Sequence, residues 1–193
     1  MLAANGVKEP KAQHFNGLPC YQFEDLLKGS AYYRGLSIND FVLAYKGDQL
    51  VGGVYGVVLG AAFKPDTDDI REAPALEMIA GLLAAGASVC AFDPEAMPNV
   101  KNLLGDQIDY ATDEYQALQN ADALLICTEW GIFRNPNFKA MKDLMKDTVI
   151  FDGRNLYELQ DMQQHGFYYS SIGRQNIYRS LWKESWLPEP LVS

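Results

Sequence analysis

The sequence has few of the residues that carry metal or redox chemistry. It contains 3 cysteines and 2 histidines in 193 residues. Cys20, Cys90 and Cys127 form no CxxC pair, and His14 and His165 stand alone, so neither residue type has metal-ligand or catalytic-pair spacing. An odd cysteine count suits a reducing compartment better than a disulfide framework. We therefore expect a cytoplasmic protein that holds no metal.

Long apolar runs and excess positive charge are also missing. No run approaches the roughly 20 residues that a helix needs to cross a bilayer, and the N-terminus lacks a signal-peptide pattern. The formal net charge is −9. Because nucleic-acid binding depends on Lys and Arg that neutralise phosphates, this balance argues against DNA or RNA. We expect a soluble protein that binds neither membranes nor nucleic acids.

The charge is distributed unevenly along the chain. Residues 1–52 carry five basic and five acidic side chains, so the other 11 basic and 20 acidic ones, and the whole net charge, fall in residues 53–193. A length of 193 residues suits one domain with a short extension. We therefore divide the chain into an N-terminal extension (1–52), an α/β domain (53–175) and a C-terminal tail (176–193).

The N-terminal extension has a weak pattern. Residues 1–20 are mixed polar and predict irregular structure, and residues 21–28 predict a short helix. Apolar alternation predicts strands at 40–45 and 49–58, joined by a turn at 46–48. This hairpin is faintly similar to one in a family of N-acetyltransferases, but the Q/RxxGxG/A loop of that family is absent. A plain hairpin is favoured, and an acetyltransferase-like or chimeric protein is the alternative.

From residue 54 onward, short apolar runs alternate with helical periodicity. The run at 54–59 stops at Gly60, and a polar loop separates it from a helix at 74–85. Six strands with short crossovers predict a three-layer, mostly parallel, Rossmann-like α/β sheet. The remaining strands are expected at 88–92, 108–111, 123–127, 148–151 and 168–171, with a helix or loop at 95–105 and helices at 114–120, 138–146 and 156–165.

Candidate binding residues follow the strand ends, because ligands of open α/β sheets lie outside the carboxyl ends of the strands. Lys64 can meet a pyrophosphate or a sugar hydroxyl, with Phe63 packing on a ring. The alternative is a surface lysine beside a phenylalanine that anchors the loop. Arg154 offers a planar fork suited to phosphate or uracil oxygens. Its alternative role is an ion pair with Asp152.

Arg71 follows a cluster of acidic residues, Asp66, Asp68 and Asp69. It can reach an anionic cofactor or neutralise Asp68 or Asp69. The acidic run lacks the spacing and the later bidentate Glu of an EF-hand, so a solvated loop is favoured over a metal site.

Two further strand ends carry residues with competing interpretations. Asp93 stands where dinucleotide-binding folds place an acid for the ribose. The preceding Gly60-Ala61-Ala62 lacks the glycine fingerprint that brings a pyrophosphate to the helix, so a role in a turn is favoured for Asp93. Trp130 can line a nucleotide pocket, and a core or interdomain role is at least as well supported.

Five motifs of this domain resemble, in order, the C-terminal domain of the UDP-glucose/GDP-mannose dehydrogenase family. The resemblance covers residues 53–175. It includes the stretch VVLGAAFKPDTDDIREAPAL, whose ordered match with four later motifs is far more specific than a lone glycine motif. The four are Phe92-Asp93-Pro94, Ala121-Asp122-Ala123 leading to Thr128-Glu129-Trp130, Phe151 to Asn155, and Gly166-Phe167 to Arg174.

The resemblance implies a UDP-glucose dehydrogenase-like domain that binds a nucleoside-diphosphate sugar. In the family, the residues matching Phe63 and Lys64 touch the nucleotide sugar, and the residue matching Arg154 reaches it, in several members across a subunit interface. The residue matching Arg71 contacts NAD across the domain cleft. The family's catalytic GGxCxPKD segment and its NAD fingerprint GxGxxG are absent here. We thus expect no catalytic residue in this chain, and NAD only with a complementary domain.

The resemblance leaves other properties open. Because the family's domain leans on its neighbours and the tail is rich in aromatics, we hypothesise a homodimer. Selectivity among UDP-glucose, UDP-N-acetyl sugars and GDP-mannose depends on parts that the resemblance does not cover. A degenerate interaction domain without a ligand is the remaining alternative to a binding module.

Overall fold

The computed structural model describes residues 54–84 and 86–177, together with four two-residue strands nearer the N-terminus. The helix expected at 21–28, most of the hairpin expected at 40–58 and the tail beyond residue 177 lie outside the described residues. The four short strands pair antiparallel, β1 with β2 and β3 with β4. They are His14–Phe15 (β1), Leu18–Pro19 (β2), Tyr45–Lys46 (β3) and Gln49–Leu50 (β4).

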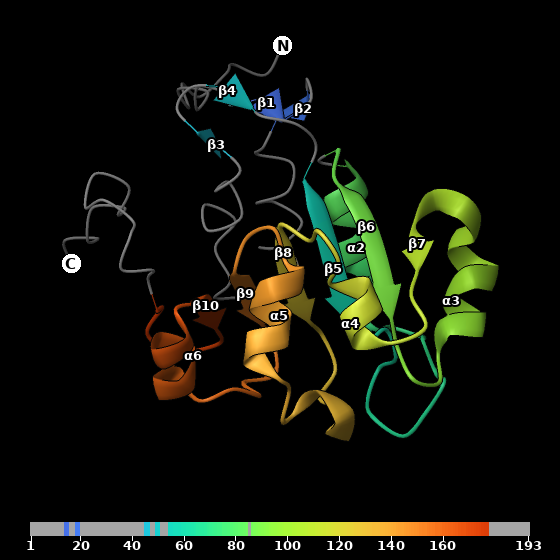
Figure 1. Ribbon diagram of the computed structural model, residues 1–193. Coiled ribbons are helices and arrows are strands. Elements are labelled where there is room, and N and C mark those ends of the chain that lie inside the picture. The colour runs from blue at the N-terminus through green and yellow to red at the C-terminus, as the bar shows by residue number, and fades with distance from the viewer. Residues whose placement is uncertain are drawn as a thin grey trace, which may run out of the picture.

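An all-parallel sheet of six strands forms the centre of the described chain (Figure 1). The order β10-β9-β8-β5-β6-β7 puts β5, the first strand along the chain, in the middle of the sheet. The α/β class, the parallel sheet and the six strands expected from the sequence are confirmed. The strands are Tyr55–Leu59 (β5), Ser88–Phe92 (β6), Asp109–Tyr110 (β7), Ala123–Ile126 (β8), Val149–Asp152 (β9) and Tyr168–Ser171 (β10).

Helices connect these strands and cover the sheet. Figure 1 shows α2 behind the sheet and α4 and α5 in front of it, which gives the expected three layers. No helix within the described residues is long and apolar enough to cross a membrane. The helices are Pro74–Ala84 (α2), Met97–Leu104 (α3), Glu114–Ala117 (α4), Phe138–Leu144 (α5) and Leu159–His165 (α6), with 3-10 turns at Gly105–Gln107 (η3) and Gly131–Phe133 (η4).

Local hydrogen bonds explain where the helices begin. Asp113 caps α4 and Asn137 caps α5, each accepting a hydrogen bond from the N–H three residues later. Helix α6 begins at residue 159 instead of the expected 156. The reason is that the N–H groups of Leu156 and Tyr157 bond to the Asp152 carboxylate, which holds the chain in a loop.

The core lies on both faces of the sheet. Every residue of β8 and β9 is buried, as are four of the five residues of β5. A fully buried Leu, Ile or Val contributes roughly 1.5–3 kcal/mol through apolar burial. Cys90 and Cys127 are also buried in this core, and burial raises the pKa of the Cys90 thiol.

Candidate functional site

The carboxyl ends of the central strands share one edge of the sheet. Because ligands of open α/β sheets bind outside this edge, we consider two places along it as candidate ligand sites. The first is the crevice between β5 and β8, where the strand order reverses. The second lies one strand farther along, beyond the ends of β8, β9 and β10. The side chains close the first place and leave the second open.

At the strand-order reversal, the loop after β5 packs directly on Thr128. The Thr128 hydroxyl donates to the carbonyl of Ala62 at 2.5 Å and lies 3.2 Å from the carbonyl of Gly60. Gly60 has φ 82°, and a Cβ added there would lie 2.5 Å from the Cβ of Thr128. The two loops therefore touch at backbone distance, which only glycine permits.

The Asp93 carboxylate completes this closure. It accepts hydrogen bonds from the N–H groups of Ala61 at 2.8 Å and Ala62 at 2.9 Å, and from the indole N–H of Trp130 at 3.0 Å. Asp93 is 1% exposed and Trp130 is 7% exposed. The N–H groups that would cradle a pyrophosphate are thus already bonded within the protein. Ala61 and Ala62 therefore have no free N–H group for the pyrophosphate of NAD.

Asp93 also has the turn role expected from the sequence. Its other carboxylate oxygen accepts from the N–H of Glu95 at 3.0 Å and of Ala96 at 2.8 Å. Trp130 is a core residue that fastens the end of β8 to this carboxylate, so it does not line a nucleotide pocket at the crevice. The structure thus supports the turn role of Asp93 and the core role of Trp130.

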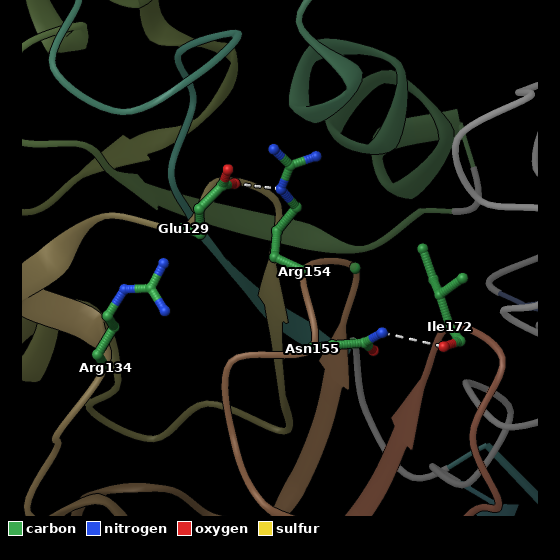
Figure 2. Close-up of a pocket in the computed structure, with 6 residues that line it drawn as sticks. Glu129, Arg134, Arg154, Asn155 and Ile172 are labelled. Atoms are coloured by element: carbon green, nitrogen blue, oxygen red, sulfur yellow. Dashed lines mark hydrogen bonds and ion pairs between the residues drawn. The ribbon is translucent and has the colours of Figure 1, made fainter.

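The second place is an open pocket of about 360 Å³ (Figure 2). Glu129 and Arg134 come from the segment after β8, and the loop after β9 supplies three residues. Ile172, just after β10, forms the remaining wall. The residues that line the pocket are Glu129, Arg134, Gly153, Arg154, Asn155 and Ile172.

Arg154 and Glu129 form an ion pair in this pocket. The Arg154 Nε–H donates to the Glu129 carboxylate, and the two side chains are 19% and 28% exposed. This hydrogen bond lowers the pKa of Glu129, and the nearby charge of Arg134 adds to the effect. The ion pair between the Arg154 guanidinium and Asp152, which the sequence offered as an alternative, is wrong. Asp152 instead accepts from the backbone N–H of Arg154 at 2.8 Å.

Asp152 shapes the loop that carries Arg154. It is fully buried, and besides the N–H of Arg154 it accepts from the N–H of Leu156 at 2.7 Å and of Tyr157 at 3.3 Å. The Tyr169 hydroxyl donates to the same carboxylate at 2.7 Å. Burial, followed by the charge of Asp152, raises the pKa of Tyr169 far above its ordinary value, so this hydroxyl stays protonated and donates.

Arg174 supports the same loop from the far side. Its guanidinium donates to the Tyr169 hydroxyl at 2.6 Å, to the carbonyl of Tyr157 at 3.0 Å and to the Ser171 hydroxyl at 2.9 Å. Asn155 closes the loop onto β10 by donating to the carbonyl of Ile172 at 3.1 Å. The backbone around Arg154 is therefore fixed from two strands.

The structure places the other predicted residues on the loop after β5, at the same edge of the sheet. Phe63 is 39% exposed, and its N–H donates to the carbonyl of Asp69 at 2.8 Å. Lys64 is exposed. Neither is among the residues that line the pocket.

Arg71 forms the ion pair that the sequence offered as one of its two roles. Its guanidinium lies 2.7 Å from Asp69, and the Arg71 side chain is 86% exposed. The hydrogen bond from Arg71 lowers the pKa of Asp69 to about 2. A contact between Arg71 and a cofactor stays a prediction.

Sequence reasoning missed Arg134 and Ile172 and assigned no role to Glu129. The sequence could have indicated Arg134, because the segment TEWGIFR, which ends with this residue, directly follows a buried strand. Within residues 54–84 and 86–177, no three His, Cys, Asp or Glu side chains are arranged to hold a metal ion. The pocket thus offers two guanidinium groups, one carboxylate and one amide, a set suited to an anion that also carries hydroxyl or amide groups.

Known proteins are similar to this chain in sequence and in fold. A family model described as the UDP-glucose/GDP-mannose dehydrogenase family, UDP binding domain, matches residues 57–159. A UDP-glucose 6-dehydrogenase of Bacillus subtilis (strain 168) is 48% identical over 120 residues, which cover 62% of this chain and 26% of that protein.

Solved structures agree. A UDP-glucose dehydrogenase from Pyrobaculum islandicum has a TM-score of 0.51 and 28% identity, covering 74% of this chain and 27% of its own. An NDP-N-acetyl-D-galactosaminuronic acid dehydrogenase from Methanosarcina mazei Go1 has a TM-score of 0.60 and 26% identity, covering 81% of this chain and 29% of its own. The chain thus spans between 26% and 29% of the length of these three relatives.

Proposed function

The chain belongs to the UDP-glucose/GDP-mannose dehydrogenase family, within its UDP binding domain, and from this premise we propose that it is a module that binds a nucleoside-diphosphate sugar. The observation that carries the proposal is the fixed position of Arg154 in the open pocket. Its side chain is only 19% exposed, and Asp152, Tyr169 and Arg174 hold the loop beneath it. An arginine held in this way meets phosphate oxygens with little loss of conformational freedom.

Phe63 and Lys64 complete the proposed site from the loop after β5. Lys64 is exposed at the same edge of the sheet and supplies a positive charge for the diphosphate or a donor for a sugar hydroxyl. The ring of Phe63, at 39% exposure, offers an apolar surface for the nucleoside or the sugar. These two roles follow from the resemblance and from the position of the loop.

NAD belongs to this proposal only as a ligand of a complementary domain. The chain's own crevice between β5 and β8 is closed by Asp93, and Gly60-Ala61-Ala62 lacks the glycine fingerprint. The dehydrogenase chemistry of the relatives would therefore need residues outside this chain. Arg71, exposed on the loop after β5, is the residue that we propose faces the cofactor in such an assembly.

Location and assembly are part of the same proposal. We place the protein in the cytoplasm as a homodimer, with residues 1–52 and 176–193 flanking the binding domain. Sedimentation of the purified chain at tens of micromolar checks the dimer. A monomer at that concentration would remove it.

Calorimetric titration of the full chain with UDP-glucose tests the binding module. We expect saturable binding that Arg154→Ala and Lys64→Ala each weaken by about tenfold, because each removes a charge-assisted hydrogen bond. Lys139→Ala is the matched control, since Lys139 is an exposed lysine of α5 that pairs with Asp143 away from the pocket. Thermal unfolding of each variant confirms that it is folded. No heat at millimolar ligand would overturn the proposal and favour a domain that no longer binds a nucleotide sugar.

A further inference from the structure

Arg134 stands across the pocket from Arg154, with Glu129 between them (Figure 2). The two arginines come from different parts of the edge, Arg134 from the segment after η4 and Arg154 from the loop after β9. In Figure 2 the guanidinium groups of Arg134 and Arg154 lie on opposite sides of the Glu129 side chain. No role for Arg134 follows from the sequence motifs, so its place in the pocket needs an explanation.

The backbone of Arg134 is fixed although its side chain is exposed. Its N–H donates to the carbonyl of Gly131 at 3.3 Å. The preceding Phe133 is 1% exposed and packs edge-on against Phe92, with 6.2 Å between the ring centroids. Because the neighbouring side chain is locked in the core, the direction in which Arg134 leaves the backbone is set by the fold.

The other arginines of the described chain bind protein groups. Arg71 pairs with Asp69, Arg154 pairs with Glu129, and Arg174 bonds to Tyr157, Tyr169 and Ser171. Within residues 54–84 and 86–177, Arg134 is the one arginine whose guanidinium has no hydrogen bond or ion pair to another residue. Its five donors are therefore available to a ligand.

The charges in the pocket do not cancel. Glu129 offsets one of the two arginines, which leaves one net positive charge in a chain whose net charge is −9. The influence of Arg134 on the pKa of Glu129 indicates that the pocket charges act on one another. A site with this balance favours an anion, and two separated guanidinium groups favour an anion with two charged groups.

We propose that Arg134 is a second phosphate-binding residue, and that the pocket takes two linked phosphates, one at each arginine. This inference rests on the proposed function and deepens it. Arg154, which is only 19% exposed, holds the phosphate next to the nucleoside, and the exposed Arg134 holds the outer one. A nucleoside diphosphate then binds more tightly than the corresponding monophosphate because of Arg134.

The test compares UDP with UMP by calorimetric titration of the full chain and its variants. We expect Arg134→Ala to weaken UDP binding by about tenfold, because a charge-assisted hydrogen bond is lost, and to change UMP binding by less than about threefold. Arg134→Lys keeps the charge without the planar fork and should retain part of the affinity for UDP. Arg154→Ala should weaken both ligands, and Lys139→Ala should weaken neither.

Each other result overturns the inference in a distinct way. If Arg134→Ala binds UDP as tightly as the parent while Arg154→Ala does not, Arg134 is a solvated surface residue and the proposed function stands. If Arg134→Ala weakens UMP and UDP equally, the assignment of the outer phosphate is wrong. If the parent binds neither UDP nor UDP-glucose, the inference fails together with the proposed function.

Discussion

The two places along the carboxyl edge of the sheet each contain a buried aspartate, and the aspartates act in opposite ways. Asp93, after β6, bonds to the N–H groups of Ala61 and Ala62 in the loop of the neighbouring strand, and this joins two loops and closes the crevice. Asp152, the last residue of β9, accepts backbone hydrogen bonds only from N–H groups of the loop that follows it. That loop keeps its shape and stands open beside the pocket.

The comparison shows that strand order alone does not decide which place along the edge stays open. The reversal between β5 and β8 has the position of a ligand crevice, yet its N–H donors are bonded internally. The pocket one strand away is lined by two arginine side chains, which we propose bind a ligand without using the backbone. A place along the edge can bind a ligand only if its hydrogen-bond donors are not already bonded within the protein.

The largest effect should come from breaking the closed crevice with Asp93→Ala. We expect the free energy of unfolding to fall by at least about 3 kcal/mol, because buried N–H donors lose their acceptor. Urea denaturation measures the loss. Asp113→Ala is the control, since this exposed carboxylate caps α4 and otherwise accepts only from the neighbouring Thr112 hydroxyl, and it should cost about 1 kcal/mol. Equal losses would mean that Asp93 does not hold the loops together.

A second change tests how closely the two loops approach. Gly60→Ala should cost about 3 kcal/mol, because the residue has φ 82° and its Cβ would lie 2.5 Å from Thr128. Gly166→Ala should cost about 1 kcal/mol, since Gly166 also has a positive φ, in the left-handed helical region, but its added Cβ would lie 3.7 Å from the nearest atom, Lys142 Nζ. The difference in urea midpoint isolates the contact. Matching midpoints would argue against a tightly closed crevice.

The support of the open pocket is tested by Tyr169→Phe. We expect a loss of about 1–2 kcal/mol in the free energy of unfolding, because Asp152 loses a donor and Arg174 loses an acceptor in a buried network. UDP-glucose binding should also weaken, as the loop of Arg154 loses part of its support. Tyr110→Phe removes an exposed hydroxyl bonded to the carbonyl of Gly105 and serves as control. Unchanged UDP-glucose binding would show that this hydrogen-bond network does not contribute to the binding site.

The smallest effect concerns the pH dependence of the Arg154–Glu129 pair. Because the pKa of Glu129 is lowered below its ordinary 4.5, the pair stabilises the fold above that pH and loses its effect as pH falls through the lowered value. Glu129→Gln should therefore reduce the loss of stability between pH 7 and 3, by under about 1 kcal/mol because the pair is partly exposed.

Urea titrations of the parent and Glu129→Gln at both pH values measure this difference. The pH dependence of Asp69→Asn serves as a comparison with that of Glu129→Gln. Asp69 also has an arginine partner that lowers its pKa, to about 2, but this partner, Arg71, is exposed and lies outside the pocket. Identical pH dependence in the parent and Glu129→Gln would show that the Arg154–Glu129 pair does not form in solution.

Most of the fold could be predicted from the sequence because its strands are buried on both faces. Continuous apolar runs such as 123–127 end at polar residues, so β5, β6, β8, β9 and β10 lie within about a residue of their expected positions. The start of α6 was predicted three residues early. Helical periodicity in residues 156–158 does not reveal that Asp152 has already bonded the N–H groups of Leu156 and Tyr157.

The site could be predicted only in part. Strand ends identified Arg154, because a residue just after a buried strand is placed by the strand itself. Its partner Glu129 lies 25 positions away and becomes a neighbour through the pairing of β8 with β9, which no local pattern encodes. The closure by Asp93 has the same origin, since β6 lies beside β5. Local chemistry predicted the candidates, and strand order decided their partners.

The two margins of the sheet bear on how the protein avoids edge-to-edge aggregation. At one margin, Ile177 pairs antiparallel with Tyr169, so the chain covers part of its own outermost strand β10. At the other, β7 has only two residues, one of them Asp109. Neither margin offers a long row of free peptide groups to a second molecule. These margins should therefore be poor templates for edge-to-edge aggregation, even at the high concentrations that calorimetry requires.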